Sequence, residues 1–256
     1  MHGISLDWFY LPLSTLELVY ALSIVFVAGV VRGLAGFGFS ALCFFSLAPV
    51  FSAQTIVPLM FVMEAIVSLH LLPKVWRQIP WRWVGVLFVG TSVGMPLGVM
   101  ALQHWQSDLV RGLAGAGVLL ACLALWRKWH FKSAESVIWL LFAGLGSGFV
   151  NGLATIGGLV VAVYMLSSNM PLTAMRAGLI LFFLIADLYG LIWLNGHNLV
   201  SPDLPSLLLV MMPVMLLGNQ LGYSLFSRID IEVMRKFTLA MLSALASIAL
   251  YSALSS

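Results

Sequence analysis

Charged residues are scarce in this sequence: they make up 8% of its 256 residues, whereas hydrophobic residues make up 62%. A soluble domain carries roughly 25% charged residues, so this chain lacks the polar side chains that a water-facing surface requires. The hydrophobic residues form runs of about twenty, the length at which an α-helix crosses the bilayer core. Strands of membrane β-barrels are shorter and alternate in polarity. The composition therefore predicts an all-α polytopic membrane protein.

The few cysteines and histidines and the lack of certain motifs exclude several classes of function. The two cysteines, Cys43 and Cys122, lie far apart in apolar runs, so the sequence indicates neither a disulfide framework nor a Cys-x-x-Cys metal site. The five histidines show no close pairing, which leaves zinc and haem without a ligand set. The sequence has no P-loop motif and no basic tract, which argues against ATP hydrolysis and nucleic-acid binding. We expect no enzyme activity, no metal and no cofactor.

The apolar runs divide the chain into about eight to ten membrane segments. They cover residues 14–32, 38–51, 54–72, 82–102, 108–126, 134–150, 157–168, 172–194, 204–226 and 232–252. Segments 38–51 and 157–168 are too short to cross as straight helices. Each follows a glycine-rich stretch, so we expect a short helix that forms a hairpin with the helix before it. The sequence leaves open whether these two segments cross or re-enter the membrane.

Loop charges predict how the chain lies in the membrane. Basic residues gather in three loops, at Lys74, Arg77 and Arg82, at Arg127, Lys128 and Lys132, and at Arg228, Arg235 and Lys236. The loops at 103–107 and 195–203 carry neither Lys nor Arg. The positive-inside rule places the basic loops in the cytoplasm. We therefore expect a multi-pass protein of the bacterial inner membrane with both termini outside.

A glycine-rich phrase occurs twice, as VRGLAGFG at residues 31–38 and as VNGLATIG at residues 150–157, a shift of 119. Further matches follow in the same order at a shift of 124: Gly94 with Gly218, Gly98 with Gly222 and Arg111 with Arg235. We interpret residues 1–128 and 129–256 as two repeats of one membrane domain. The loop charges give them opposite orientations, which is typical of an inverted-repeat transporter. Each repeat then holds a glycine-broken hairpin and three spanning helices.

The repeated phrase predicts a binding site built from two helix breaks. Glycine lets a chain leave helical geometry without a clash, and unwound backbone inside a membrane must be buried in protein or line a wet cavity. We expect both breaks near mid-membrane, where the free N–H groups that start the following helices favour an anion. The candidate substrate-binding residues there are Gly33, Gly36, Gly38, Gly152, Thr155, Gly157 and Gly158. The alternative is close helix packing, the interpretation we prefer for the later GxxxG glycines.

Four polar residues lie within or beside apolar segments. Arg32 precedes the first break, and Asn151 holds the matching place at the second. Both are candidate substrate-binding residues; the guanidinium of Arg32 can hold an oxyanion, although it could instead snorkel to the membrane surface. Glu64 and Asp187 are candidates for proton coupling, because carboxylates at membrane depth are functional by default. The alternative is an ion pair with Arg32 or another arginine that only holds helices together.

The remaining candidates lie nearer segment ends. We interpret Arg176 as an anchor at the cytoplasmic surface, and we keep it as the candidate gate residue because a gate contact is the sharper alternative. Asn219 and Gln220 either donate to substrate oxygens or form hydrogen bonds between helices. Arg111 and Arg235 are interpreted as anchors.

Four features carry a resemblance to a known family: VRGLAGFGFSALCFF, its echo VNGLATIGGLVVAVYMLS, the following NMPLTAMRAG, and the GxxxG helices late in each half. With these the chain resembles the TauE/SafE membrane permeases, the sulfite and organosulfonate exporter family, over essentially its whole length. The resemblance implies export of a small sulfur oxyanion or sulfonate, coupled to the proton gradient. We expect a secondary active transporter that works by alternating access; a passive anion channel is the alternative. The expected partners are that anion, protons and membrane lipid, and a homodimer is compatible with the sequence.

Overall fold

A computed structural model of the chain describes residues 4–6, 9–11, 13–127, 136–166 and 170–225, together with positions 240, 243, 244 and 247. These residues are helical apart from a short antiparallel pair of strands, β1 (Ile4–Leu6) and β2 (Phe9–Leu11). The prediction of an all-α membrane fold is confirmed. The strand pair was not predicted, because three-residue strands leave no periodic pattern in a sequence. The boundary between the halves at 128/129, and nearly all of segment 232–252, lie outside the described residues.

The helices follow the predicted segments to within a few residues. They are α1 (Thr15–Ala35), α2 (Phe39–Ser46), α3 (Ala53–Val75), the 3₁₀ turn η1 (Trp76–Gln78), α4 (Trp81–His104), α5 (Ser107–Trp126), α6 (Val137–Ala154), α7 (Gly157–Leu166), α8 (Leu172–Gly196) and α9 (Leu204–Leu225). In the described part, six helices are long and apolar enough to cross a membrane: α1, α3, α4, α6, α8 and α9. Helices α2 and α7, with 8 and 10 residues, are too short to cross, as predicted.

Local sequence explains where several helices begin and end. The hydroxyl of Ser14 accepts the Glu17 N–H, and the Glu17 carboxylate accepts the Ser14 N–H, so α1 starts with a capping box. Ser52 caps α3 through the N–H of Thr55. Helix α1 ends at a left-handed glycine, Gly36. These caps fix the entry and the exit of the first helix of the candidate hairpin.

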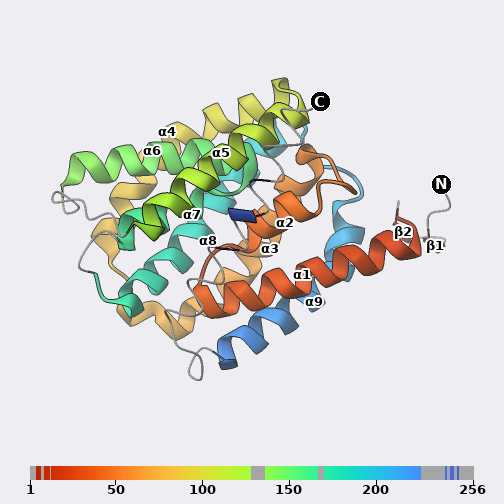
Figure 1. The fold of residues 1–256 in the computed structure, drawn as a ribbon, viewed down its shortest axis with the longest axis horizontal. Helices are drawn as coiled ribbons and strands as arrows, with labels where there is room; N and C mark the ends of the chain where they lie inside the picture. The colour runs from red at the N-terminus through yellow and green to blue at the C-terminus, as the bar shows by residue number, and fades with distance from the viewer. Residues whose placement is uncertain are drawn as a thin grey trace.

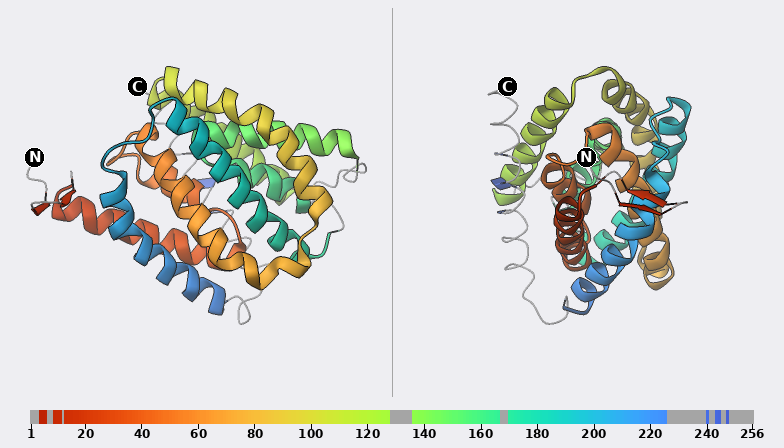
Figure 2. Two further views of the ribbon diagram at one scale, coloured as in Figure 1. Left: turned by 180° about the vertical axis from the view of Figure 1, so that it is seen from behind. Right: turned by 90° about the vertical axis from the view of Figure 1, so that its right-hand side faces the viewer.

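The long helices associate in three pairs, α1 with α9, α4 with α6, and α3 with α8. Figure 1 shows α1 beside α9 and α4 beside α6, and the left view of Figure 2 shows α3 beside α8. Each pair takes one helix from before residue 128 and one from after it. The two halves therefore interlock in one bundle and do not form two separate units.

Glycines hold two of these pairs close together. Gly33 of α1 lies so near the backbone of α9 that an added Cβ would overlap the carbonyl of Asn219, and Gly152 of α6 lies equally near α4 at Met95. Gly33 and Gly152 are related by the shift of 119, and Met95 and Asn219 by the shift of 124. The glycines that the sequence assigned to packing lie in the same two contacts: Gly94, Gly98, Gly218 and Gly222. Small residues permit such close backbone approach.

The direction of the helices differs between the pairs. In α1–α9 and in α4–α6, contacts advance along both helices together, so each pair is parallel. In the third pair, Phe61 meets Gly190, whereas Pro80, just after α3, meets Gly178. Helices α3 and α8 are therefore antiparallel. A two-fold axis in the membrane plane that exchanges the two halves would produce this combination.

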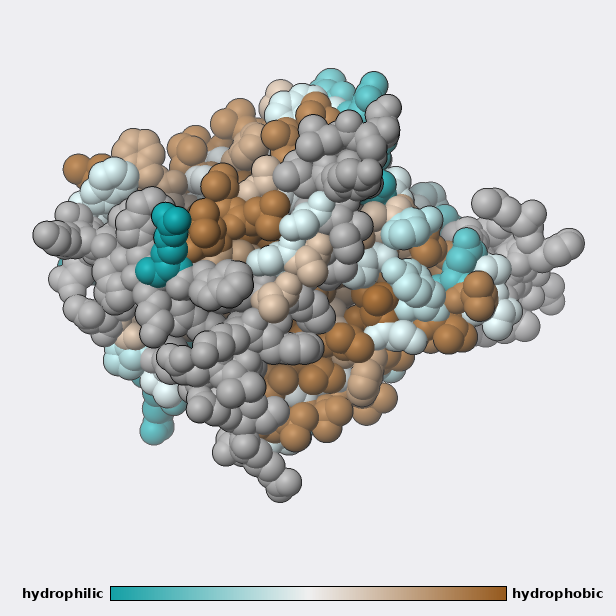
Figure 3. Space-filling model, in the orientation of Figure 1, coloured by the Kyte–Doolittle hydropathy of each residue, from teal (hydrophilic) through white to brown (hydrophobic). Residues whose placement is uncertain are grey.

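Apolar side chains cover much of the outside of the bundle as well as filling its inside. Leu16, Leu120 and Ile192 are 82%, 68% and 69% exposed, and in the coloured part of the face in Figure 3 brown apolar residues predominate, with hydrophilic residues mostly toward the ends. Helices that are apolar all round belong in a membrane. Against this background, the buried charged side chains of the described residues stand out: Arg32, Glu64 and Asp187.

Candidate functional site

The first helix break lies at Gly36–Gly38. Both glycines have left-handed backbone angles, φ of 81° and 93°, which residues with a Cβ rarely adopt. The N–H of Gly36 donates to the carbonyl of Arg32 and closes α1. The helix therefore continues past residue 32, where we expected it to end, and Arg32 and Gly33 belong to its last turn. The predicted break is confirmed, but it begins after Ala35.

The second break repeats the turn at Gly36 with a different residue. Helix α6 continues to Ala154, past the expected end at residue 150, and Thr155 holds the left-handed conformation with φ of 57°. Its N–H donates to the carbonyl of Asn151, as that of Gly36 does to Arg32. A β-branched residue is unusual in this conformation, which costs on the order of 1–3 kcal/mol. Strain of this kind, held in place by its surroundings, marks the second break as a candidate functional element.

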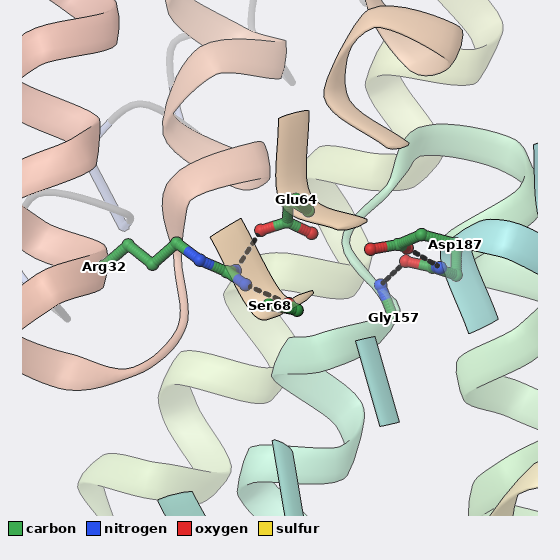
Figure 4. Close-up of polar contacts among 6 residues, drawn as sticks. Arg32, Glu64, Ser68, Gly157 and Asp187 are labelled. Atoms are coloured by element: carbon green, nitrogen blue, oxygen red, sulfur yellow. Dashed lines mark hydrogen bonds and ion pairs between the residues drawn. The ribbon is translucent and has the colours of Figure 1, made fainter. Parts of the chain in front are cut away.

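Arg32 points into the protein and does not snorkel. Its side chain is 2% exposed, and its Nη1 donates to Oε1 of Glu64 at 2.5 Å. Its Nη2 donates to the hydroxyl of Ser68 at 2.8 Å, and its guanidinium lies 4.9 Å from the centre of the Phe183 ring. The left of Figure 4 shows Arg32 reaching from α1 to Glu64 and Ser68 on α3. The ion pair with Arg32, which the sequence left open for Glu64 as the alternative to proton coupling, is thus present.

At the second break an amide takes the place of the guanidinium. Nδ2 of Asn151 donates to Oδ1 of Asp187 at 3.3 Å, and Oδ1 of Asn151 accepts the N–H of Gly157 at 3.1 Å. Asn151 therefore caps α7, so the N–H of Gly157 is not free, contrary to our expectation. Asp187 is fully buried, and its Oδ2 has no hydrogen-bond partner. In Figure 4 the Asp187 carboxylate extends toward Glu64.

Both carboxylates lie near the midpoints of long helices. Glu64 is halfway along α3, and Asp187 is near the middle of α8. The last turn of α1 therefore reaches the middle of α3 through Arg32, and the last turn of α6 reaches the middle of α8 through Asn151. This agrees with breaks deep in the membrane, since α3 and α8 are both long enough to cross it.

The two breaks meet at one small cavity. It is lined by Gly38, Ser40, Ala41 and Glu64 from the first half and by Thr155, Ile156, Gly158, Leu159 and Phe183 from the second. The space that a water-sized sphere can occupy in it is about 10 Å³, roughly the least that holds one water molecule. An oxyanion of four or more heavy atoms is larger, so the helices must part before it can bind.

Three residues at this centre were missed or underrated in the sequence. Ser40 is buried beside Glu64, and its hydroxyl makes no hydrogen bond of good geometry. Its place in the first turn after the break was a signal that deserved more weight. Ser68 lies one helical turn after Glu64, so the spacing of four residues could have found it. Phe183 gave no signal, because an aromatic residue in an apolar segment is ordinary.

Eight predicted substrate-binding residues lie outside the cavity lining: Arg32, Gly36, Asn151 and Gly157, described above, and Gly33, Gly152, Asn219 and Gln220. Gly33 and Gly152 are in the helix contacts described above, so the packing interpretation accounts for them. Asn219 is buried in the α1–α9 contact, with its Oδ1 unpartnered, and Gln220 is exposed. The structure does not bring Gln220 to the site.

Arg176 joins three helices at one end of the bundle. Its Nη2 donates to the carbonyl of Gly33 at 2.9 Å, and its guanidinium lies 4.9 Å from the centre of the Tyr223 ring. Lys74 approaches the same ring at 5.5 Å. The carbonyls in the last turn of a helix lack helical partners and attract cations. Arg176 of α8 therefore ties the end of α1 to α9, beside Gly36 of the first break.

Polar contacts also close the opposite end. Nδ1 of His197, after α8, lies 2.7 Å from Oε1 of Gln103 in α4. Arg111 of α5 donates to the carbonyls of Ala48 and Phe51, after α2. We interpreted Arg111 as an anchor near a segment end. The structure adds that it binds the turn that follows α2. Within the described ranges, no three His, Cys, Asp or Glu side chains lie close enough to hold a metal ion.

Comparison with models of protein families shows which family the chain belongs to. The family model of the sulfite exporter TauE/SafE matches residues 21–249, nearly the whole chain. The chain belongs to the TauE/SafE family. TauE/SafE membership places it among membrane exporters of sulfite and related anions, a family of transporters, and agrees with its six apolar helices. No curated protein and no solved structure gives a significant match. Arg32, Glu64, Asn151, Asp187 and both breaks all lie inside the TauE/SafE match.

Proposed function

We propose that this TauE/SafE protein is a secondary active transporter that exports sulfite or an organosulfonate, coupled to protons, by alternating access. The observation that carries the proposal is the buried guanidinium of Arg32 beside the cavity where the two breaks meet. A guanidinium presents parallel N–H donors that match two oxygens of a sulfite or sulfonate group. Burying a guanidinium inside a membrane protein costs free energy, and a role in function would explain why the protein keeps it there.

The substrate anion binds nearer the first break than the second. Helix α2 starts at Gly38 without a side-chain cap, so its first N–H groups remain to face the cavity. The first N–H of α7 is taken by Asn151. Arg32, the start of α2 and the hydroxyl of Ser40 are then the donors for substrate oxygens, and Thr155 and Gly158 form the opposite wall.

Alternating access follows from the interlocked pairs. Residues 1–128 and 129–256 are the inverted repeats, and the matched glycine contacts and the antiparallel α3–α8 pair support this relation. The α1–α9 and α4–α6 pairs rock about α3 and α8. Arg176 closes the cytoplasmic end and the Gln103–His197 contact closes the outer end. This assignment uses the loop charges, which favour an orientation with both termini outside the bacterial inner membrane.

The cavity supports a carrier over a passive channel. With room for about one water molecule, it is too narrow for the continuous aqueous path past the binding residues that an open channel needs. A channel would not need titrating carboxylates, so Glu64→Gln and Asp187→Asn together would leave its flux largely intact.

Flux through proteoliposomes tests the proposal. Sulfite, thiosulfate, sulfoacetate, sulfate and chloride are compared with and without a pH gradient. We expect saturable, gradient-dependent flux of a sulfur anion, loss of that flux in Arg32→Ala, and full activity in Arg77→Ala, a control at an exposed arginine. Flux of several anions regardless of the gradient would establish a channel. Absence of flux for every sulfur anion would refute the substrate class.

A further inference from the structure

The buried charges of the described residues do not balance if all are ionised. Arg32 contributes one positive charge, and Glu64 and Asp187 contribute two negative charges. Helices α6 and α9, which also pack against α3, carry no Asp, Glu, Lys or Arg. The other titratable groups nearby are the thiol of Cys43 from α2 and, beside Arg32, Arg176 from α8. An unbalanced charge in a low-dielectric interior is costly, so the cluster needs one proton.

That proton belongs on Asp187 in the closed state. Glu64 has an ion pair with Arg32, whereas Asp187 has, among the described residues, only the amide of Asn151 as a hydrogen-bond partner. A neutral carboxylic acid suits such an amide partner, and the ion pair of Arg32 and Glu64 is then balanced by itself.

Glu64 occupies the place on Arg32 that an anion must take. Nη1 of Arg32 is bound to Glu64, Nη2 to Ser68, and a face of the guanidinium is covered by Phe183. An oxyanion that binds Arg32 from the cavity therefore displaces the carboxylate of Glu64, which itself lines that cavity. Two negative groups would then share one cation.

We propose that Glu64 is the built-in counter-anion of Arg32, and that a substrate anion replaces it while Glu64 takes up one proton. The inference rests on the proposed function and deepens it. The proton passes from a hydronium ion, through water at the cavity, to Glu64 and leaves water behind. Oε2 of Glu64 has no hydrogen-bond partner, so it can accept the proton there. Anion and proton therefore bind together and leave on the same side, as symport and not as exchange, so the outward gradient of the anion, and not the inward proton gradient, drives export.

Calorimetry with the purified protein counts these protons. Methanesulfonate is the probe, because it keeps one negative charge over the whole working pH range. Titrations in two buffers of different ionisation enthalpy give the protons taken up for each anion bound. We expect about one, with an apparent Kd that rises about tenfold for each pH unit in the alkaline range. Glu64→Gln should bind the anion without proton uptake and with a pH-independent Kd.

Asp187→Asn is the matched control, since Asp187 already holds its proton. It should keep the uptake of about one proton for each anion. Loss of uptake in Asp187→Asn with retention in Glu64→Gln would overturn the assignment to Glu64. Binding by the unmodified protein with no proton uptake, or with proton release, would overturn the inference even if neither variant folds.

Proteoliposomes separate failure of this inference from failure of the proposed function. With an outward methanesulfonate gradient, symport makes the lumen alkaline, and exchange makes it acidic. Anion flux without alkalinisation would overturn the proton coupling at Glu64 and leave transport standing. Neither binding nor flux of methanesulfonate or sulfite would overturn both.

Discussion

The two helix breaks share the turn that ends their first helix and differ in chemistry. Each ends its first helix with a left-handed residue whose N–H donates four residues back, Gly36 to Arg32 and Thr155 to Asn151. The first break carries a charged side chain and an uncapped helix start, whereas the second carries an amide that caps its own helix. A matching turn in each half is compatible with alternating access, in which the two sides of the protein open in turn. A single anion-binding centre needs one cation, which Arg32 can supply. The residue at the matching position, Asn151, can therefore serve as a helix cap.

Of the changes that distinguish the two breaks, removing Arg32 should have the largest effect on stability and on anion binding. Arg32→Ala leaves Glu64 buried without its cation, which should destabilise the protein by about 3–5 kcal/mol and reduce anion binding about thirtyfold or more. Thermal unfolding in detergent and anion binding measure the two effects. Asn151→Ala, at the matching position, should cost only about 1 kcal/mol through the lost cap.

A double variant separates charge balance from binding at Arg32. Arg32→Ala with Glu64→Gln should recover most of the lost stability, because no ionised group is then left unpaired. Anion binding should stay lost. Recovery of binding in the double variant would show that the substrate does not bind to the guanidinium.

The helix contacts should be affected equally in the two halves. Gly33→Ala and Gly152→Ala each place a Cβ against the backbone of a neighbouring helix, so each should destabilise the protein by about 1–3 kcal/mol. Gly85→Ala, with open space around it in α4, should instead stabilise by about 0.5–1 kcal/mol. Thermal unfolding of the three variants tests this. A large effect in one half alone would contradict the matched packing.

The left-handed residues should give the smallest effects, with opposite signs. Gly36→Ala forces a Cβ into the left-handed region and should cost about 1–2 kcal/mol. Thr155→Gly removes strain but adds freedom to the unfolded chain, so it should stabilise by at most about 1 kcal/mol. Thermal unfolding reports both changes. If Thr155→Gly were as destabilising as Gly36→Ala, the strain assigned to Thr155 would be wrong.

The sequence predicted what depends on local pattern. Apolar length located the helices, and the repeated glycines located the breaks. The depth of Glu64 in its segment made the ion pair with Arg32 one of two open interpretations, and the structure contains that pair. The role of Asn151 as a cap was not predictable, because it depends on the turn that Thr155 makes. Pairing of α1 with α9 was also hidden, since long-range contacts leave no local periodicity.

The pairing of α1 with α9 has a consequence for synthesis. Helix α1 enters the membrane well before α9, the helix that covers its glycine face, because α9 starts only at Leu204. Until then Arg32 sits on a helix whose final packing is incomplete. Helix α3, which carries Glu64, follows closely and can neutralise it early. The ion pair at the centre of the closed protein can thus hold the first half in the membrane while the second is still on the ribosome.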